Sequence, residues 1–194
     1  MSTAQQGELM SVEDYLAGEL VSKVKHEYLG GFVYAMAGAR LAHNVIKGNI
    51  FAGLHSRVRG GKCRPYDSDT KIRVRLPTHV RFYYPDAPVV CHSNPQDYSF
   101  QNQPVLIVEV LSRQTRRTDE VEKKDAYLTI PSLSFYLLVE QEMPVVTAYR
   151  WIEQGFTREV YMGPEALIPL PELTTELPLA EIYEDVEFTP EEQP

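Results

Sequence analysis

The chain has 194 residues, of which 43% are hydrophobic and 24% are charged, as is typical of a soluble globular protein. This length is enough for one domain with a sizeable core and is short for two. No apolar run approaches the length of a membrane span and no basic-then-apolar leader begins the chain, so we expect a cytoplasmic protein without a membrane segment. Cys63 and Cys91 form no CxxC pair, which favours free thiols in a reducing compartment over a disulfide or a zinc site.

The net charge of −8 is unevenly distributed along the chain. From Trp151 to the end there are eleven acidic residues and one basic residue, Arg158. Of the totals of 27 and 19, this leaves 16 acidic and 18 basic residues before Trp151. The segment His55–Arg81 alone carries eight Arg and Lys side chains against Asp67 and Asp69. Such a segment either holds a phosphate backbone or is a solvated strand edge protected against aggregation, and the sequence favours neither.

The N-terminal part of the chain predicts two helices. We expect residues 1–10 to be disordered and a short helix over Val12–Ala17, capped by Ser11. A strand over residues 32–37 should follow. The clearest helix is Leu41–Arg59, whose apolar residues recur at three-to-four spacing before two glycines end it.

The remaining segments predict mainly strands. Strands are expected over residues 70–76, 80–84, 89–91, 105–111, 133–140, 144–151 and 155–162. One helix should begin after Thr118 and end at Pro131, and a short helix is possible over Leu179–Glu184. This order predicts a single α/β domain over residues 11–188 with a mixed sheet, followed by an acidic tail over residues 189–194.

Glu109 is the one carboxylate inside the apolar run Val105–Leu111, which is typical of a strand buried on both faces. A buried carboxylate is costly unless a salt bridge, a proton or a bound cation compensates its charge. Glu109 could alternatively lie near the open end of the strand and pair with an arginine.

Several other polar residues are candidates for the same site. Asp119, Lys123 and Tyr127 recur every four residues and so share one helix face. Asp119 and Lys123 could alternatively form an ordinary pair on a solvated face. Asp86 could be a turn residue after Pro85, and a lone helix histidine such as His43 is usually structural.

The order of these residues resembles a known family. Pro85-Asp86, followed by Glu109 on a buried strand, resembles the PD-(D/E)XK motif of restriction-endonuclease-like nucleases. More closely, the chain resembles the Uma family of putative restriction endonucleases. The matching stretches are Glu27-Tyr-Leu-Gly-Gly-Phe-Val-Tyr34, His43, Tyr84-Pro-Asp86, Val108-Glu-Val-Leu-Ser112, and Asp119 with Lys123 and Tyr127.

The resemblance implies a restriction-endonuclease-like core, in which helices flank a mixed central sheet, with additional C-terminal strands. Asp86 and Glu109 match the two metal-binding carboxylates, and Glu27 matches an acidic residue from the N-terminal region. The motif's lysine should stand two residues after Glu109, where this chain has Leu111. The Uma pattern offers Lys123, on the next helix, in its place.

The function implied is a Mg²⁺-dependent endonuclease acting on DNA, with Mn²⁺ as a possible substitute. Glu27, Asp86 and Glu109 would bind the metal and Lys123 would supply positive charge at the catalytic site. Arg113, Arg116, Arg117 and His43 are candidates for contacts with the substrate, and a homodimer is expected.

Two other functions stay open. One is a catalytically degenerate nuclease fold that binds nucleic acid or a protein without cutting. The other is a metal-dependent hydrolase of a different phosphorylated substrate.

Overall fold

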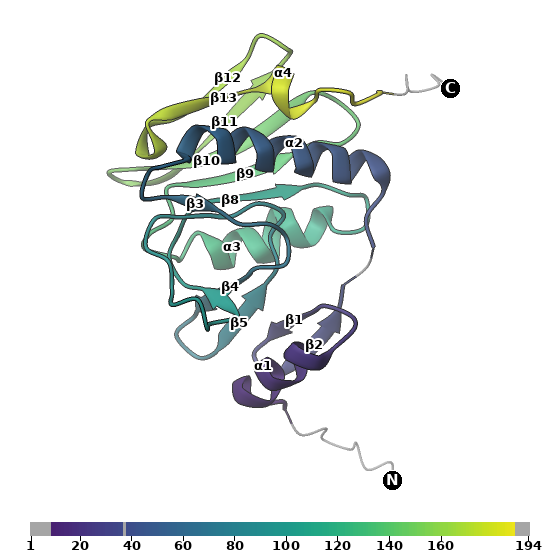
Figure 1. The fold of residues 1–194 in the computed structure, drawn as a ribbon, viewed down its shortest axis with the longest axis vertical. Coiled ribbons are helices and arrows are strands. Elements are labelled where there is room, and N and C mark those ends of the chain that lie inside the picture. The colour runs from purple at the N-terminus through teal and green to yellow at the C-terminus, as the bar shows by residue number, and fades with distance from the viewer. Residues whose placement is uncertain (1–8, 37, 189–194) are drawn as a thin grey trace.

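The computed structural model describes residues 9–36 and 38–188, whose larger sheet has six strands in the order β11-β10-β9-β8-β6-β3 (Figure 1). Strands β8 and β9 run parallel at its centre, with Glu109 paired to Leu138. The other neighbouring strands are antiparallel. The six strands are β3 (Arg64–Pro65), β6 (Val89–Val90), β8 (Pro104–Val110), β9 (Phe135–Val139), β10 (Val145–Ile152) and β11 (Gly155–Met162).

A second sheet of five strands has the order β2-β1-β5-β4-β7. Helix α1 (Val12–Val21) packs on it, because the rings of Tyr15, Tyr28 and Phe82 form one buried aromatic cluster with centroids 5.0–6.0 Å apart. Ser11 caps this helix by accepting a hydrogen bond from the Asp14 amide. The five strands are β1 (His26–Leu29), β2 (Phe32–Ala35), β4 (Lys71–Arg75), β5 (Val80–Tyr83) and β7 (Phe100–Gln101).

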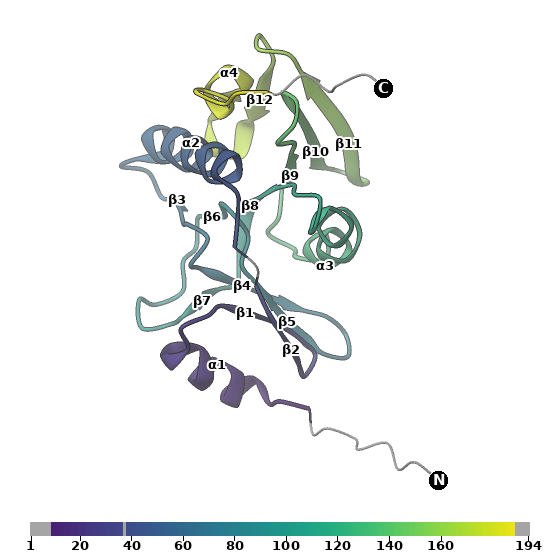
Figure 2. The same cartoon turned by 90° about the vertical axis from the view of Figure 1, so that its right-hand side faces the viewer.

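Helix α2 (Leu41–Val58) and helix α3 (Lys124–Tyr127) lie on opposite sides of β8 (Figure 2). The π-helical turn η1 (Thr118–Lys123) leads into α3. Because side chains alternate along a strand, Leu106, Val108 and Val110 pack in the core that contains α2, whereas Ile107 and Leu111 pack in the core that contains α3. Each such buried side chain contributes about 1.5–3 kcal/mol. Glu109 shares the α3 side with them, which positions the site described below.

The C-terminal segment packs against the other side of α2. It consists of β12 (Leu167–Leu170), the turn η2 (Pro171–Leu173), β13 (Thr175–Pro178) and α4 (Leu179–Ile182). Asn49 of α2 donates hydrogen bonds to the carbonyl groups of Ile182 and Glu184, and Arg57 pairs with Glu181 at 2.6 Å. These contacts fix the position of α2 on the sheet.

The structure confirms the predicted α/β class, with helices flanking a mixed central sheet and additional C-terminal strands. The strands form two mixed sheets, and the sequence analysis did not predict β1, β3, β7 or the β12–β13 hairpin. The disorder predicted for the N-terminus falls largely on residues 1–8, and the acidic tail on residues 189–194, both outside the described residues. Among residues 9–36 and 38–188, no helix combines the length and apolar composition that a membrane crossing requires.

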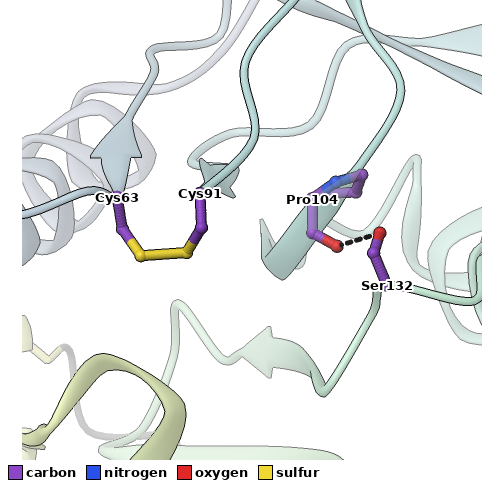
Figure 3. Close-up of a disulfide and its surroundings, with 4 residues drawn as sticks. All are labelled: Cys63, Cys91, Pro104 and Ser132. Atoms are coloured by element: carbon purple, nitrogen blue, oxygen red, sulfur yellow. Dashed lines mark hydrogen bonds between the residues drawn. A yellow bond between two sulfur atoms is a disulfide. The ribbon is translucent and has the colours of Figure 1, made fainter.

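The prediction of free cysteines is wrong, because Cys63 and Cys91 form a disulfide (Figure 3). The register of β3 and β6 pairs Arg64 with Val90, so the two cysteines stand one residue further along, opposite each other. They are separated by 28 positions in the sequence, and the pairing of two such short strands could not be foreseen. Cysteine count therefore gives no support to a reducing compartment.

We expect reduction of this disulfide to destabilise the protein. Closing a loop over a sequence separation of 28 restricts the unfolded chain and is worth about 3–4 kcal/mol in the chain-entropy model. Urea unfolding of the oxidised and the reduced protein should show a lower midpoint after reduction. The Cys63→Ser/Cys91→Ser protein should match the reduced wild type and should not respond to reductant. Equal midpoints for oxidised and reduced wild type would contradict the prediction.

Candidate active site

The site is built around Glu109, whose side chain lies on the face of β8 that is directed toward α3. Its side chain is 3% exposed, although the strand around it is apolar. Two groups from the following helical segment reach the same oxygen. The ammonium of Lys123 and the hydroxyl of Tyr127 each donate a hydrogen bond to Glu109 Oε1 at 3.3 Å. A salt bridge therefore compensates Glu109, with a lysine rather than the arginine considered from the sequence.

Lys123 is surrounded by carboxylates from three separate segments. Besides Glu109 Oε1, its Nζ lies 3.1 Å from Glu27 Oε1 on β1 and 3.2 Å from Asp119 Oδ1 on η1. The latter two oxygens are buried but have no partner with hydrogen-bond geometry among the described residues. One ammonium thus faces three carboxylates, which leaves a surplus of negative charge in a buried site.

Asp86 lies beside Glu109 and is held by the backbone of β8. Its Oδ2 accepts a hydrogen bond of 2.8 Å from the Val110 amide, while its own amide donates to the Val108 carbonyl at 3.1 Å. Nε2 of His43, in the first turn of α2, lies 3.2 Å from the same Oδ2. The side chains of Asp86 and His43 are 13% and 12% exposed, so both are partly accessible. The Asp86 carboxylate is therefore held in place by the surrounding protein and is also partly accessible to solvent.

Burial and like charges determine the protonation of the cluster. Burial raises the pKa of Glu109 well above its ordinary value of 4.5; Lys123 opposes this rise, and Asp119, Asp86 and Glu27 add to it. Burial likewise raises the pKa of Asp119, and Lys123 again opposes the rise. Burial disfavours the ammonium of Lys123, but the surrounding carboxylates outweigh burial and raise its pKa well above the ordinary 10.5. Lys123 therefore keeps its positive charge, and three carboxylates share this one cation.

The structure brings together most residues predicted for the site. Glu27, Asp86, Glu109 and Lys123 converge as expected, and His43 joins them through Asp86.

Two residues that share the helix face of Lys123, Asp119 and Tyr127, were given no catalytic or metal-binding role in the prediction. Asp119 is 2% exposed and Tyr127 is fully buried, so the solvated face considered for Asp119 and Lys123 is wrong. Their four-residue spacing with Lys123 was the signal that could have included them.

The three arginines predicted to contact substrate lie in the loop and turn that follow β8. Arg113 pairs with Glu142 at 2.8 Å, and Arg116 pairs with Glu120 at 3.1 Å and also with Glu140. Arg117 is exposed and makes no ion pair within the described part of the chain. Within the described residues, Arg117 is therefore the one of the three that no carboxylate engages.

The donor set is chemically suited to a hard divalent cation. Mg²⁺ takes carboxylate oxygens together with waters, and here buried carboxylates outnumber the lysine that neutralises them. Within residues 9–36 and 38–188, however, no three His, Cys, Asp or Glu side chains are gathered closely enough to hold a metal ion. The ammonium of Lys123 lies between Glu27, Glu109 and Asp119, and the metal set Glu27, Asp86 and Glu109 stays a prediction.

The chain matches the model of a known protein family. The model of the family Uma2, described as "Putative restriction endonuclease", matches residues 12–180. The chain belongs to the Uma2 family. The family model spans every element that contributes to the carboxylate cluster.

The chain is also similar to individual proteins. The chain is 34% identical over 149 residues to the uncharacterised protein slr1290 of Synechocystis sp., covering 75% of this chain and 76% of that protein. It is 29% identical over 136 residues to sll1609 of the same organism, covering 69% and 76%. A crystal structure described as "a putative nuclease belonging to DUF820" from Anabaena variabilis superposes with a TM-score of 0.68 at 17% identity. It covers 84% of this chain and 91% of that one, which shows the shared fold.

We expect Lys123→Met to destabilise the protein at neutral pH by about 3–5 kcal/mol, because it leaves buried carboxylates without their cation. The loss should shrink on acidification. Carboxyl groups whose pKa is raised in the folded state bind more protons there than in the unfolded chain. Stability is therefore regained as pH falls toward the ordinary values of 4.5 and 3.8. Urea unfolding at several pH values measures this effect.

Lys124→Met is the matched control for this experiment. Lys124 is the next residue and pairs with the exposed Asp125 at 3.6 Å, so its loss should cost less than about 1 kcal/mol at every pH. A Lys123→Met protein as stable as the Lys124→Met protein at neutral pH would contradict the charge balance described here.

Proposed function

We propose that the protein is a metal-dependent endonuclease that hydrolyses phosphodiester bonds in DNA. The observation that carries this proposal is that Glu27 and Glu109, from distant parts of the chain, both pair with Lys123, while Asp86 lies close enough to Glu109 to raise its pKa. Membership of the Uma2 family and the likeness in fold to a protein described as a nuclease support it. The homodimer and the cytoplasmic location expected from the sequence remain predictions.

Mg²⁺, or Mn²⁺ in its place, would be held by Asp86 and Glu109 with Glu27 contributing. Such an ion lowers the pKa of a bound water and offsets negative charge that develops on the phosphate. Asp86 is oriented for this role, because the Val110 amide and His43 both hold its Oδ2. The surplus of buried carboxylate supports binding of a further cation, since a cation would relieve the mutual repulsion that raises the pKa of Glu109.

Lys123 would supply positive charge next to the reacting phosphate. The usual position two residues after Glu109 holds Leu111, whose side chain is buried in the apolar cluster with Tyr127. Lys123 reaches Glu109 from η1, which leads into α3 on the same side of β8, so its ammonium is close to the same carboxylate without an extra charge on β8. A compact ammonium so placed can orient a water molecule or stabilise charge in the transition state.

Cations near the mouth of the site would contact the DNA backbone. Arg117 is exposed, has no ion pair with any residue of 9–36 or 38–188, and is the strongest candidate. Arg113 and Arg116 could contribute only by exchanging Glu142, Glu120 and Glu140 for phosphate. The predicted order of importance is therefore Arg117 before Arg113 and Arg116.

A second candidate function is a catalytically degenerate module that binds DNA without cutting it. The specific observation in its favour is that Lys123 already lies within 3.3 Å of three carboxylates, so it could replace the metal as the resident cation. The two functions differ in their response to added metal.

We expect Mg²⁺ or Mn²⁺ to raise the melting temperature of the wild-type protein. At 100 times the dissociation constant, a ligand of the native state adds about 2.7 kcal/mol, which for a chain of this size corresponds to roughly 5–10 °C. Glu109→Gln should melt higher than wild type without metal, because it removes a buried charge, and should lose the response to metal. A wild type without any response would favour the degenerate module.

We expect the wild type to cleave supercoiled plasmid with Mg²⁺ or Mn²⁺ and to stop when EDTA is added. Asp86→Asn, Glu109→Gln and Lys123→Ala should each lower the rate by at least about 10²-fold, as is usual when charge stabilisation at a reacting centre is removed. Gel electrophoresis of nicked and linear products measures the rates.

Glu122→Gln is the matched control for cleavage. Glu122 lies in η1 next to Lys123, but its carboxylate faces Arg81 and Tyr83 at 3.3 and 3.2 Å. It should keep the wild-type rate. Cleavage that survives Lys123→Ala but not Glu109→Gln would keep the nuclease and remove the lysine from its mechanism.

A further inference from the structure

A concave site lies at the C-terminal end of α2, away from the carboxylate cluster. It is a cleft of about 890 Å³ between the end of α2, β3, the turn that leads into β4, and the segment that leads into β7. This volume is in the range of pockets that bind small molecules and cofactors. None of the residues of the candidate active site lines it.

The charge of this cleft is positive. Arg59 and Arg64 line it, are exposed, and make no ion pair within the part of the chain that the structure describes. Asp69 is the one acidic residue among the lining residues, and its carboxylate is engaged by Lys25. Two uncompensated guanidinium groups in a concave site favour an anion, and their planar donors suit phosphate.

Most other arginines of the basic segment His55–Arg81 are already engaged. Arg57 pairs with Glu181 and Arg81 with Glu122, while Arg73 lies over the ring of Phe100 at 4.6 Å. The structure thus separates the segment into side chains that stabilise the fold and side chains that remain available. Arg59 and Arg64 belong to the second group, and both line the cleft.

Aromatic rings form other parts of the wall. Tyr98 is 51% exposed and packs edge-to-face on Phe100, with ring centroids 5.3 Å apart. On the α2 side, Phe51 stacks on His55 at 5.9 Å. Exposed aromatic faces near cations are suited to a planar, anionic ligand, because nucleic-acid bases stack on them. Amide side chains such as Gln96 add polar groups to the rim.

We propose that this cleft binds a nucleotide, with the phosphate at Arg59 and Arg64 and the base against the aromatic wall that includes Tyr98. The shared chemistry is one phosphate and one base, which can come from a free nucleotide or from an unpaired nucleotide of a strand. Helix α2 separates the cleft from the active site: His55 follows His43 by twelve residues, or about 18 Å along the helix. A single strand would span that distance with about five stacked nucleotides.

Calorimetric titration of the full-length protein in EDTA tests this proposal with four probes: AMP, adenosine, inorganic phosphate and the oligonucleotide dA10. The absence of metal makes the result independent of cleavage, so a failed nuclease assay leaves this test valid. AMP should bind, and adenosine and phosphate should each bind at least about tenfold more weakly, because each lacks one half of the recognised group. If phosphate binds as tightly as AMP, the aromatic wall contributes nothing and the proposal is wrong.

Arg59→Gln/Arg64→Gln should weaken AMP binding by at least about tenfold. Lys62→Gln is the matched control, because Lys62 is an exposed cation of the same segment that does not line the cleft. Tyr98→Ala should weaken AMP but not phosphate, whereas Trp151→Ala, which removes a ring of equal exposure (52%) on β10, should change neither. Circular dichroism confirms that each variant is folded.

The oligonucleotide distinguishes the two sources of the nucleotide. If dA10 binds at least about tenfold more tightly than AMP, and the double arginine variant removes that advantage, the cleft recognises an unpaired strand. If AMP binds as tightly as dA10, the ligand is a free nucleotide. The proposal is overturned if neither AMP nor dA10 binds, or if the double arginine variant binds both as tightly as Lys62→Gln does.

Discussion

The ammonium of Lys123 lies between carboxylates of three elements that would otherwise repel one another. It contacts Glu27 of the five-stranded sheet, Glu109 of the six-stranded sheet and Asp119 of its own turn. A buried charge of either sign is costly alone, so the lysine and the carboxylates each require the other. Because Glu27 and Glu109 come from different sheets, the two salt bridges of Lys123 also link the sheets.

The helical turn that carries Lys123 is adapted to this task. Thr118–Lys123 forms a π-helical turn, a geometry that is often found at functional sites. The hydroxyl of Tyr136 on β9 donates a hydrogen bond of 2.9 Å to the Asp119 carbonyl, which ties the turn to the sheet. The turn places Asp119 and Lys123 against β8 instead of in solvent. The alternating side chains of β8 explain why Glu109 faces them, since its neighbours Val108 and Val110 point to α2.

The sequence predicted most residues of this site but not how their charges compensate one another. A continuous apolar run identified β8 and three-to-four spacing identified α2, and motif order singled out Glu27, Asp86 and Glu109, because these signals are local or sequential. Strand β1 was not predicted, since its four residues, His26–Leu29, are polar at two positions, although β1 forms a hairpin with the next strand, β2, and also pairs with the distant β5. Burial of Asp119 and the opposition of Cys63 to Cys91 depend on tertiary register, which no local pattern records.

The net charge of the chain is a poor guide to its partners, because ion pairs within the protein neutralise many of the charged side chains. The chain carries −8, yet Glu181 of the acidic C-terminal part is paired with Arg57 and Glu122 with Arg81. At physiological salt, unpaired charges act over about 8 Å, so a phosphate responds to the side chains near it and not to the total. Asp86 contacts His43 in the first turn of α2, whereas Arg59 and Arg64 line the cleft at the C-terminal end of this helix. A cation and an anion can therefore be attracted to different ends of the same helix.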